Sequence, residues 1–215
     1  MVAARWRDEF EQWHRDADHW WTALNGGEPQ TVMAALATAF EDNEAAAAPL
    51  GVEGREATLV VLVPPPSAVP ERRPTLTDSG NLSLKKLTKR QSSDLYLQMV
   101  CGYLLVTLKE AFAVVPGLHS VRVVAVRATP VDTYGRVQAE AVMAARVERS
   151  RLAGVRWADA DAAHAVNDVA TELVWQQKGP SHELVPIDLN AHPQIATVLN
   201  AVDIDELADA TPRTH

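Results

Sequence analysis

The first 24 residues alternate apolar and polar positions at helical spacing. Apolar side chains recur at intervals of four and three residues, which is the pattern of a single helix stripe. This stripe consists of Trp6, Phe10, Trp13, Ala17, Trp20 and Leu24. The glycines at 26 and 27 suit a helix exit, because glycine tolerates left-handed backbone. With a second helix expected over residues 31–44, residues 1–50 are predicted to form a helical N-terminal region.

Further along the chain, the apolar pattern changes to that of β-strands. Residues 57–63 are continuously apolar or β-branched, which predicts a strand buried on both faces. Residues 137–148 alternate between apolar and polar, which predicts a half-buried strand. Pro186 places the last strand at a sheet edge, because proline cannot donate to a ladder. The predicted strands are residues 57–63, 121–128, 137–148, 173–177 and 183–189, with the second and third joined as an antiparallel hairpin.

A long helical pattern covers residues 93–114, and a shorter one precedes it over residues 84–89. Its apolar run, residues 99–106, is shorter than the roughly 20 residues that a membrane-spanning helix needs. Because the helix is apolar on nearly all sides around Val100, we expect it to be buried at the centre of the domain. Cys101 is the only cysteine, which excludes an intramolecular disulfide and predicts a small core residue.

Two more helices are expected near the C-terminus, over residues 159–172 and from Pro193 to about residue 201. Together these elements predict an α+β fold with a mixed or antiparallel sheet of about five strands, a central buried helix and the helical N-terminal region. Residues 1–215 are expected to form a single domain.

Two segments have the composition of loops. Residues 64–83 contain five prolines together with the turn formers Asp78, Ser79 and Gly80, which predicts a long mobile loop. Loops of this length inside a domain are usually functional or disordered. Residues 203–215 are acidic and are predicted to form a loosely held tail.

The formal net charge of −8 conceals an uneven distribution. Residues 1–70 carry a net charge of −7, residues 71–156 carry +7, and residues 157–215 carry −8. The overall value favours a soluble protein and argues against a general nucleic-acid coat. The basic centre, however, indicates an acidic partner, a nucleic acid, or neutralisation within the fold.

Six cations lie on either side of the predicted loop, at Arg72, Arg73, Lys85, Lys86, Lys89 and Arg90. In a phosphate-binding protein they would give binding a steep salt dependence. No aromatic residue is interleaved among them for base stacking. Docking against the acidic segments, in the same chain or in a second copy, explains the cluster equally well.

The tryptophan stripe has two interpretations. If Trp6, Trp13 and Trp20 pack on the body of the domain, they belong to its core. If the first helix projects instead, its heptad-like spacing offers a seam to a second copy or to a partner protein, with Trp6, Phe10, Trp13 and Trp20 as the partner face. Trp21 widens the stripe and favours packing against a sheet or several helices.

Motifs for catalysis are incomplete. The chain has no HExxH, no glycine-rich phosphate loop followed by lysine, and no GxSxG elbow, so neither a metal site nor a cofactor is predicted. Pro130, Asp132 and Glu140 stand near a predicted hairpin, and Glu110 is an acidic residue on the preceding helix. In this order of elements, residues 91–177 resemble the core of restriction-endonuclease-like nucleases. The resemblance implies a divalent metal held by these acids beside a phosphate, although Val142 stands where that family has its lysine.

These observations lead to one principal hypothesis and two alternatives. The principal hypothesis is a non-catalytic interaction or accessory subunit that forms a homo-oligomer or a heteromeric complex through the Trp-rich helix and the basic segment. The alternatives are a nucleic-acid-binding protein and a degenerate metal-dependent nuclease with Glu110, Asp132 and Glu140 as its acids. The N-terminus lacks the apolar core of a signal peptide, so we expect a cytoplasmic protein with no membrane association.

Overall fold

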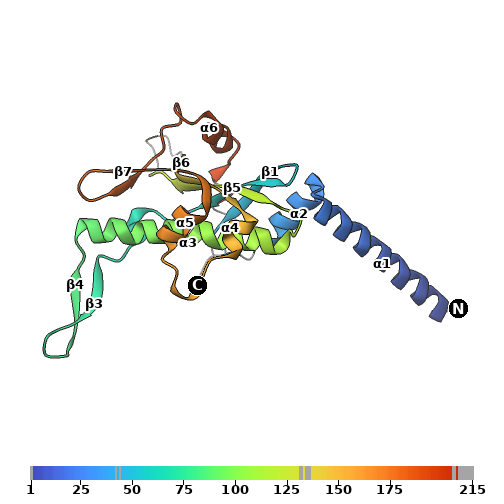
Figure 1. Cartoon of the computed structure of the whole chain (residues 1–215), viewed down its shortest axis with the longest axis horizontal. Coiled ribbons are helices and arrows are strands. Elements are labelled where there is room, and N and C mark those ends of the chain that lie inside the picture. The colour runs from blue at the N-terminus through green and yellow to red at the C-terminus, as the bar shows by residue number, and fades with distance from the viewer. Residues whose placement is uncertain are drawn as a thin grey trace.

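The computed structural model describes residues 2–41, 43, 45–130, 133, 137–204 and 207, and of residues 2–5 it describes only the backbone. A six-stranded mixed sheet lies at its centre (Figure 1). In spatial order its strands are β1 (Ala47–Glu53), β2 (Glu56–Leu62), β5 (Ser120–Ala128), β6 (Ala139–Glu148), β7 (Ala170–Lys178) and β8 (Glu183–Val185). Only β2 and β5 pair in parallel, and the other neighbours pair antiparallel. The predicted α+β fold is therefore confirmed.

Within the six-stranded sheet, sequence patterning missed β1, whose residues 47–50 lie in the region that was predicted to be helical. Its sequence, AAPLGVE, contains a proline, a glycine and two alanines, all of which have low strand propensity. It forms because the β1–β2 hairpin supplies its hydrogen bonds, with a register shift between Pro49 and Gly51. The sheet consequently has six strands rather than about five, and Pro186 follows β8 at the edge as expected.

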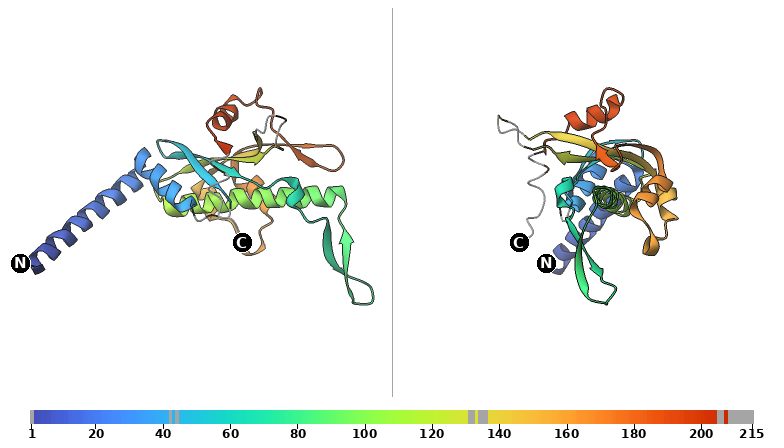
Figure 2. Two further views of the ribbon diagram at one scale, coloured as in Figure 1. Left: turned by 180° about the vertical axis from the view of Figure 1, so that it is seen from behind. Right: turned by 90° about the vertical axis from the view of Figure 1, so that its left-hand side faces the viewer.

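The long helix α3 (Lys89–Val114) connects the parallel strands β2 and β5 and covers one face of the sheet (Figure 2, right). Its start is fixed by a capping box, in which the Thr88 hydroxyl accepts from the Gln91 backbone and the Gln91 side chain accepts from the Thr88 backbone. Leu104 and Leu108 are fully buried at its centre. By length and composition alone α3 could cross a membrane, a property that the core helices of soluble proteins share. In this structure it packs against the sheet, as predicted.

The C-terminal end of α3 is held by one arginine. Arg149, the first residue of α4 (Arg149–Ala153), donates to the backbone carbonyls of Phe112, Val115 and Leu118 at 2.6–2.8 Å. Its guanidinium also lies 4.8 Å above the ring of Phe112. Carbonyls at a helix end have no partner within the helix, so this side chain satisfies groups that would otherwise be buried unpaired.

The opposite face of the sheet is covered over part of its area by α6 (Pro193–Asn200) and the segment that follows it (Figure 2). Ile195 and Leu207 pack there with Val124, Val126 and Ala144 in a second apolar cluster. Residues 141–145 of β6 are therefore all buried. The prediction of a half-buried strand was wrong here, because Ala141 and Ala144 pack in the cluster beside α6 while Val142, Met143 and Ala145 pack in the main core.

The other helices are short or lie outside the central sheet. Glu28 caps α2 (Pro29–Phe40) by accepting from the backbone of Gln30 and Thr31. Asp161 caps α5 (Ala162–Val169) in the same way. The first helix is α1 (Val2–Gly26), and short 3-10 turns lie at Pro66–Ala68 and Trp157–Asp159.

Residues 64–83 are not a continuous loop. They contain β3 (Arg72–Leu76) and the start of β4 (Leu82–Lys86), which form a two-stranded antiparallel hairpin outside the main sheet. Its turn is closed by the backbone N–H of Thr77, which donates to the Asn81 carbonyl, and Gly80 adopts a φ of +78°. The predicted helix over residues 84–89 was also wrong, because residues 84–86 pair with β3 and the capping box delays the helix start to Lys89.

The acidic C-terminal segment lies mostly outside the described residues. Within its described part, the side chains of Ile204 and Leu207 are buried. For these two residues the expectation of a loosely held tail does not apply, since they contribute apolar surface to the layer beside α6.

Candidate functional site

Helix α1 projects away from the body of the molecule (Figure 1). Every side chain from residue 6 to residue 22 is exposed, and the first fully buried side chain along the helix is Leu24. At 1.5 Å per residue, the exposed length from Trp6 to Trp21 is about 22 Å. The sequence therefore predicts the helix correctly, but the part of its apolar stripe from Trp6 to Trp20 does not pack on the body, and only Leu24 is buried.

Two glycines allow close backbone contacts that fix the C-terminal end of α1 against the body. A Cβ at Gly117, in the turn before β5, would lie 2.5 Å from the backbone oxygen of Asn25. Gly27, with a φ of +78°, lies against the backbone oxygen of Gly54 in the β1–β2 turn. The chain leaves α1 through this tight contact, so the helix direction is set by backbone packing at its last turn.

The aromatic stripe of α1 holds five of the exposed large apolar side chains among the described residues. Between 47% and 68% of each large side chain is exposed, and the side chains concerned are Trp6, Phe10, Trp13, Trp20 and Trp21. Within the stripe the rings of Phe10 and Trp13 stack with centroids 6.3 Å apart, and Phe10 also contacts the ring of His14 at 4.3 Å. The interpretation of the tryptophans as core is wrong for the isolated chain, and the partner-face interpretation stays open.

Four of the six predicted cations lie on the projecting β3–β4 hairpin, which we call the arm. Register pairs Arg72 with Lys86 and Arg73 with Lys85 directly across the two strands. Like charges in this position destabilise a hairpin. All four are exposed, and none forms an ion pair within the described part of the chain.

The other two cations lie in the first turn of α3, at the base of the arm. Lys89 is exposed, while Arg90 lies 3.9 Å from the carboxylate of Asp94 and 3.3 Å from the ring of His182. The structure therefore brings the predicted basic cluster together along one edge of the molecule. Only Arg90 among the six has a side-chain partner in the described residues.

The arm also has an apolar face that sequence reasoning missed. Because opposite residues of an antiparallel pair share a face, Leu76 and Leu82 lie side by side near the tip, with Pro74 and Leu84 next to them. The three leucines are 61–76% exposed. The signal was present in the sequence as apolar residues at every second position on both sides of a turn, but the prolines favoured a loop.

The acidic candidates of the nuclease resemblance lie apart. Glu140 forms an ion pair with Arg127 across the β5–β6 hairpin at 3.0 Å, and Arg127 in turn interacts with Tyr96 near the start of α3. Glu110 lies near the other end of α3, where it accepts a hydrogen bond from Asn43. Tyr96 and Glu110 are 14 positions apart, which corresponds to about 21 Å along the helix.

Asp132 lies outside the described residues, so its position relative to the other two acids is not part of the structure. Among the residues that are described, no group of three or more His, Cys, Asp or Glu side chains converges as metal ligands would. Glu110 and Glu140 each have a local hydrogen-bonding or ionic partner instead. The described residues therefore give the metal-dependent nuclease alternative no support.

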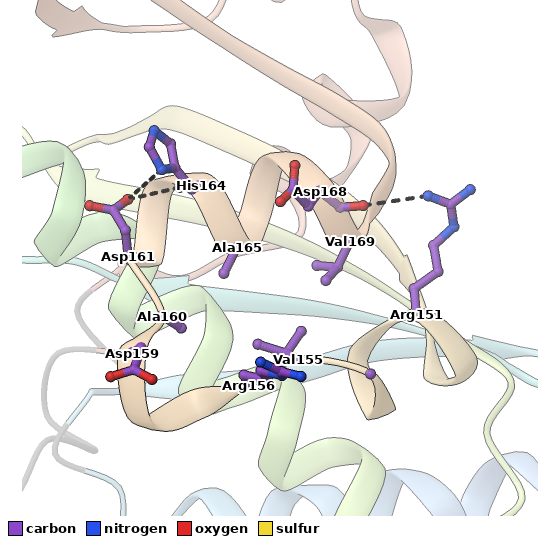
Figure 3. A pocket seen from close by; sticks show the side chains of 11 residues that line it. Arg151, Val155, Arg156, Asp159, Ala160, Asp161, His164, Ala165, Asp168 and Val169 are labelled. Carbon is purple, nitrogen blue, oxygen red and sulfur yellow. Dashed lines mark hydrogen bonds and ion pairs between the residues drawn. The ribbon is translucent and has the colours of Figure 1, made fainter.

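A cleft of about 530 Å³ separates α5 from the segment after α4 (Figure 3). Its charged side chains are mixed in sign, and Figure 3 shows Asp161 bonded to His164 and Arg151 reaching the backbone oxygen of Asp168. Hydrogen bonds from Gln98 and from the His164 backbone hold the pKa of Asp161 below its ordinary value. The polar groups here cap and brace α5 and present no nucleophile beside a base.

Cys101 is a core residue, as predicted. Its side chain is 1% exposed and its thiol contacts the sulfur of Met143 at 3.9 Å. Burial, with a smaller contribution from Asp161, raises the pKa of Cys101 to about 12. A thiol with this pKa is protonated at neutral pH, so it does not act as a nucleophile.

No protein-family model, curated protein or solved structure matches the chain. Among the described residues, most of the exposed large apolar side chains lie on two projecting elements, the aromatic face of α1 and the arm.

Proposed function

We propose that this chain is a non-catalytic assembly subunit that docks through the aromatic face of α1 and through the arm. The observation that supports the proposal is the row of large aromatic side chains on a helix that leaves the body. Tryptophan is the residue most enriched among those that dominate binding energy in protein interfaces. A helix that served only the fold would turn this face inward.

The amount of apolar surface supports the same proposal. A large aromatic side chain buries roughly 150–250 Å² when fully covered. Five such side chains at about half exposure present on the order of 500 Å² on a single helix, which already equals the largest apolar patch of a typical monomer. Patches of this size on soluble domains usually mark an interaction site.

Light scattering at several protein concentrations, with and without 0.5 M salt, tests the self-association part of this proposal. We expect concentration-dependent association of the wild type and its loss in Trp13→Ser/Trp20→Ser. The matched control is Glu11→Ser/Asp18→Ser, which changes two positions on the outer face of the same helix and should weaken association by less than about 3-fold. Association that persists in the tryptophan variant would contradict the role given to the stripe.

A second candidate function, nucleic-acid binding, is favoured by the facing cations of the arm. An exposed strip of Arg and Lys that has no carboxylate partner among the described residues suits a phosphate backbone. The test is fluorescence anisotropy with labelled single- and double-stranded DNA and RNA. Affinity should fall steeply with salt and be lost in the Lys85, Lys86, Lys89 and Arg90 alanine variant, whereas no binding at 50 mM salt would exclude this candidate.

A further inference from the structure

The two unexplained surfaces lie at opposite ends of the molecule. The base of α1 sits at the turn between α3 and β5, and the arm leads into the first residue of α3. The 26 residues of α3 separate these points by about 39 Å. Both appendages point away from the body in Figure 1 and in the rear view of Figure 2, so they cannot meet within one chain.

The two surfaces carry opposite charge. Residues 2–26 contain 3 basic and 5 acidic residues, and residues 72–86 contain 4 basic residues and 1 acidic residue. The two apolar faces are flanked by charges of opposite sign. Glu9 and Asp16 lie beside the tryptophan stripe, and Arg72 and Lys86 lie next to the leucines on the same face of the arm. Complementarity of this kind selects partners and suppresses incorrect pairings.

Charge disfavours the two symmetric alternatives. An α1–α1 pair would bring two acidic helices together, and Glu9 and Asp16 occupy the positions that flank the seam on one side. A pair of arms would bring eight cations together. Only the contact between α1 and an arm combines apolar burial on both sides with attraction between the flanking charges.

We propose that the aromatic face of α1 in one copy docks on the leucine face of the arm in a second copy of this chain. This inference rests on the proposed function and names its partner. The dimensions agree, because the exposed stripe is about 22 Å long and each five-residue strand of the arm is about 17 Å long. Docking would cover Leu76, Leu82 and Leu84 and place Arg72 and Lys86 beside the acidic flank of α1.

The contact also explains why the arm exists as a separate hairpin. An isolated two-stranded hairpin is marginally stable in water, and the facing cations weaken it further. A helix from a second copy supplies the missing apolar layer. A copy turned as in the left panel of Figure 2 presents α1 on the side where Figure 1 shows the arm, so two copies related by a two-fold axis have both contacts on matching sides.

The experiment is complementation between two variants of the full chain. The helix variant is Trp13→Ser/Trp20→Ser, and the arm variant is Arg72→Glu/Lys86→Glu. Each alone should show a self-dissociation constant raised about 30-fold or more, because the first loses central apolar surface and the second sets like charges against the acidic flank of α1. Mixed together they should form mixed pairs, because the intact α1 of one fits the intact arm of the other.

A matched control keeps the charge change and moves it to the other face of the arm. Arg73 and Lys85 lie on the face opposite the leucines, so Arg73→Glu/Lys85→Glu adds the same charge and should change the dissociation constant by less than about 3-fold. A second arm variant, Leu76→Ser/Leu84→Ser, removes apolar surface and should behave like the first. Circular dichroism and thermal melting verify the fold of each, and sedimentation velocity with one partner labelled measures mixed pairs.

The direction in which salt changes the strength of association is an independent test. Raising the salt from 50 mM to 0.5 M should weaken a contact between oppositely charged surfaces, whereas it would strengthen a pairing of two acidic helices. Weaker association at high salt together with mixed pairs supports the proposal. Stronger association at high salt overturns it.

The outcomes separate this inference from the proposed function. If the wild type associates and depends on the tryptophans but not on the arm, the inference fails and the assembly role of α1 stands. If the wild type is monomeric in every condition, the inference fails and α1 is left for an unlike partner. If the dissociation constant is unchanged by the variants of both α1 and the arm, both proposals fail.

Discussion

The central helix α3 and the projecting helix α1 are of similar length, and both carry large apolar side chains, yet they have opposite roles. In α3 most of these side chains are buried against the sheet, with Leu95 and Val106 as exposed exceptions, whereas in α1 the aromatic side chains are exposed. The large aromatic side chains of α1 show that side-chain size does not explain the difference. It comes from attachment, since α3 packs against β2, β5 and α5 while α1 is fixed only at its last turn. Large apolar side chains are therefore buried in one region and exposed in the other.

The largest expected effect is on α3. Leu104 is fully buried at the middle of the helix, so Leu104→Ala should lower the free energy of unfolding by about 3–5 kcal/mol through lost transfer energy and a residual cavity. Urea denaturation measures it. A loss below about 1 kcal/mol would contradict the assignment of α3 to the core.

The next effect concerns the end of α3. Arg149→Met keeps the length of the side chain but removes three hydrogen bonds to backbone carbonyls. We expect a loss of about 2–3 kcal/mol in the free energy of unfolding, because those carbonyls are left without donors. Arg149→Lys, which supplies fewer donors, should fall between wild type and Arg149→Met, and equal stability of all three would show that the carbonyls have other partners.

A smaller effect on stability is expected from Glu56, which lies among charged side chains at the start of β2. Burial raises the pKa of Glu56, but hydrogen bonds from Ser120 and Arg146 and the charges of Arg146 and Arg122 outweigh it, so this pKa lies below its ordinary value. The carboxylate therefore contributes stability above about pH 4.5 and loses it as the pH falls through the lowered pKa.

Glu56→Gln should remove this contribution, which we expect to be about 1 kcal/mol at pH 7 because the group is partly exposed. The measurement is the free energy of unfolding of both proteins between pH 7 and pH 3. The difference between them should narrow toward low pH. A constant difference would mean that the lost hydrogen bonds of the side chain, rather than its charge, carry the effect.

The smallest effects are expected on the two appendages. Trp13→Ser on α1 and Leu82→Ser on the arm each change an exposed residue, so the free energy of unfolding of the monomer should change by less than about 0.5 kcal/mol. Urea denaturation at protein concentrations below any self-association measures it. A loss comparable to that of Leu104→Ala would show that these side chains pack on the body, and the contrast between α1 and α3 would no longer hold.

Local sequence was sufficient to predict the elements in which apolar residues recur at regular spacing. The stripe of α1, the apolar length of α3 and the hairpin around β5 and β6 all follow from residue spacing, because each is stabilised by its own hydrogen bonds or by a neighbour in the chain. Local sequence was insufficient for β1 and for residues 72–86. Residues 47–50 were assigned to the helical N-terminal region and the prolines of residues 64–83 indicated a loop, whereas both segments form strands through pairing with a partner strand.

For the candidate surfaces, the sequence determined which residues are apolar and which are charged, including the tryptophan stripe and the six cations. It did not determine that the stripe would face water or that the cations would share an arm with exposed leucines. Those outcomes depend on where α1 leaves the body at Gly117 and on the register that pairs Arg72 with Lys86. The periodicity of a segment specifies its own conformation and its apolar face, whereas only the packing of distant segments decides whether that face is covered.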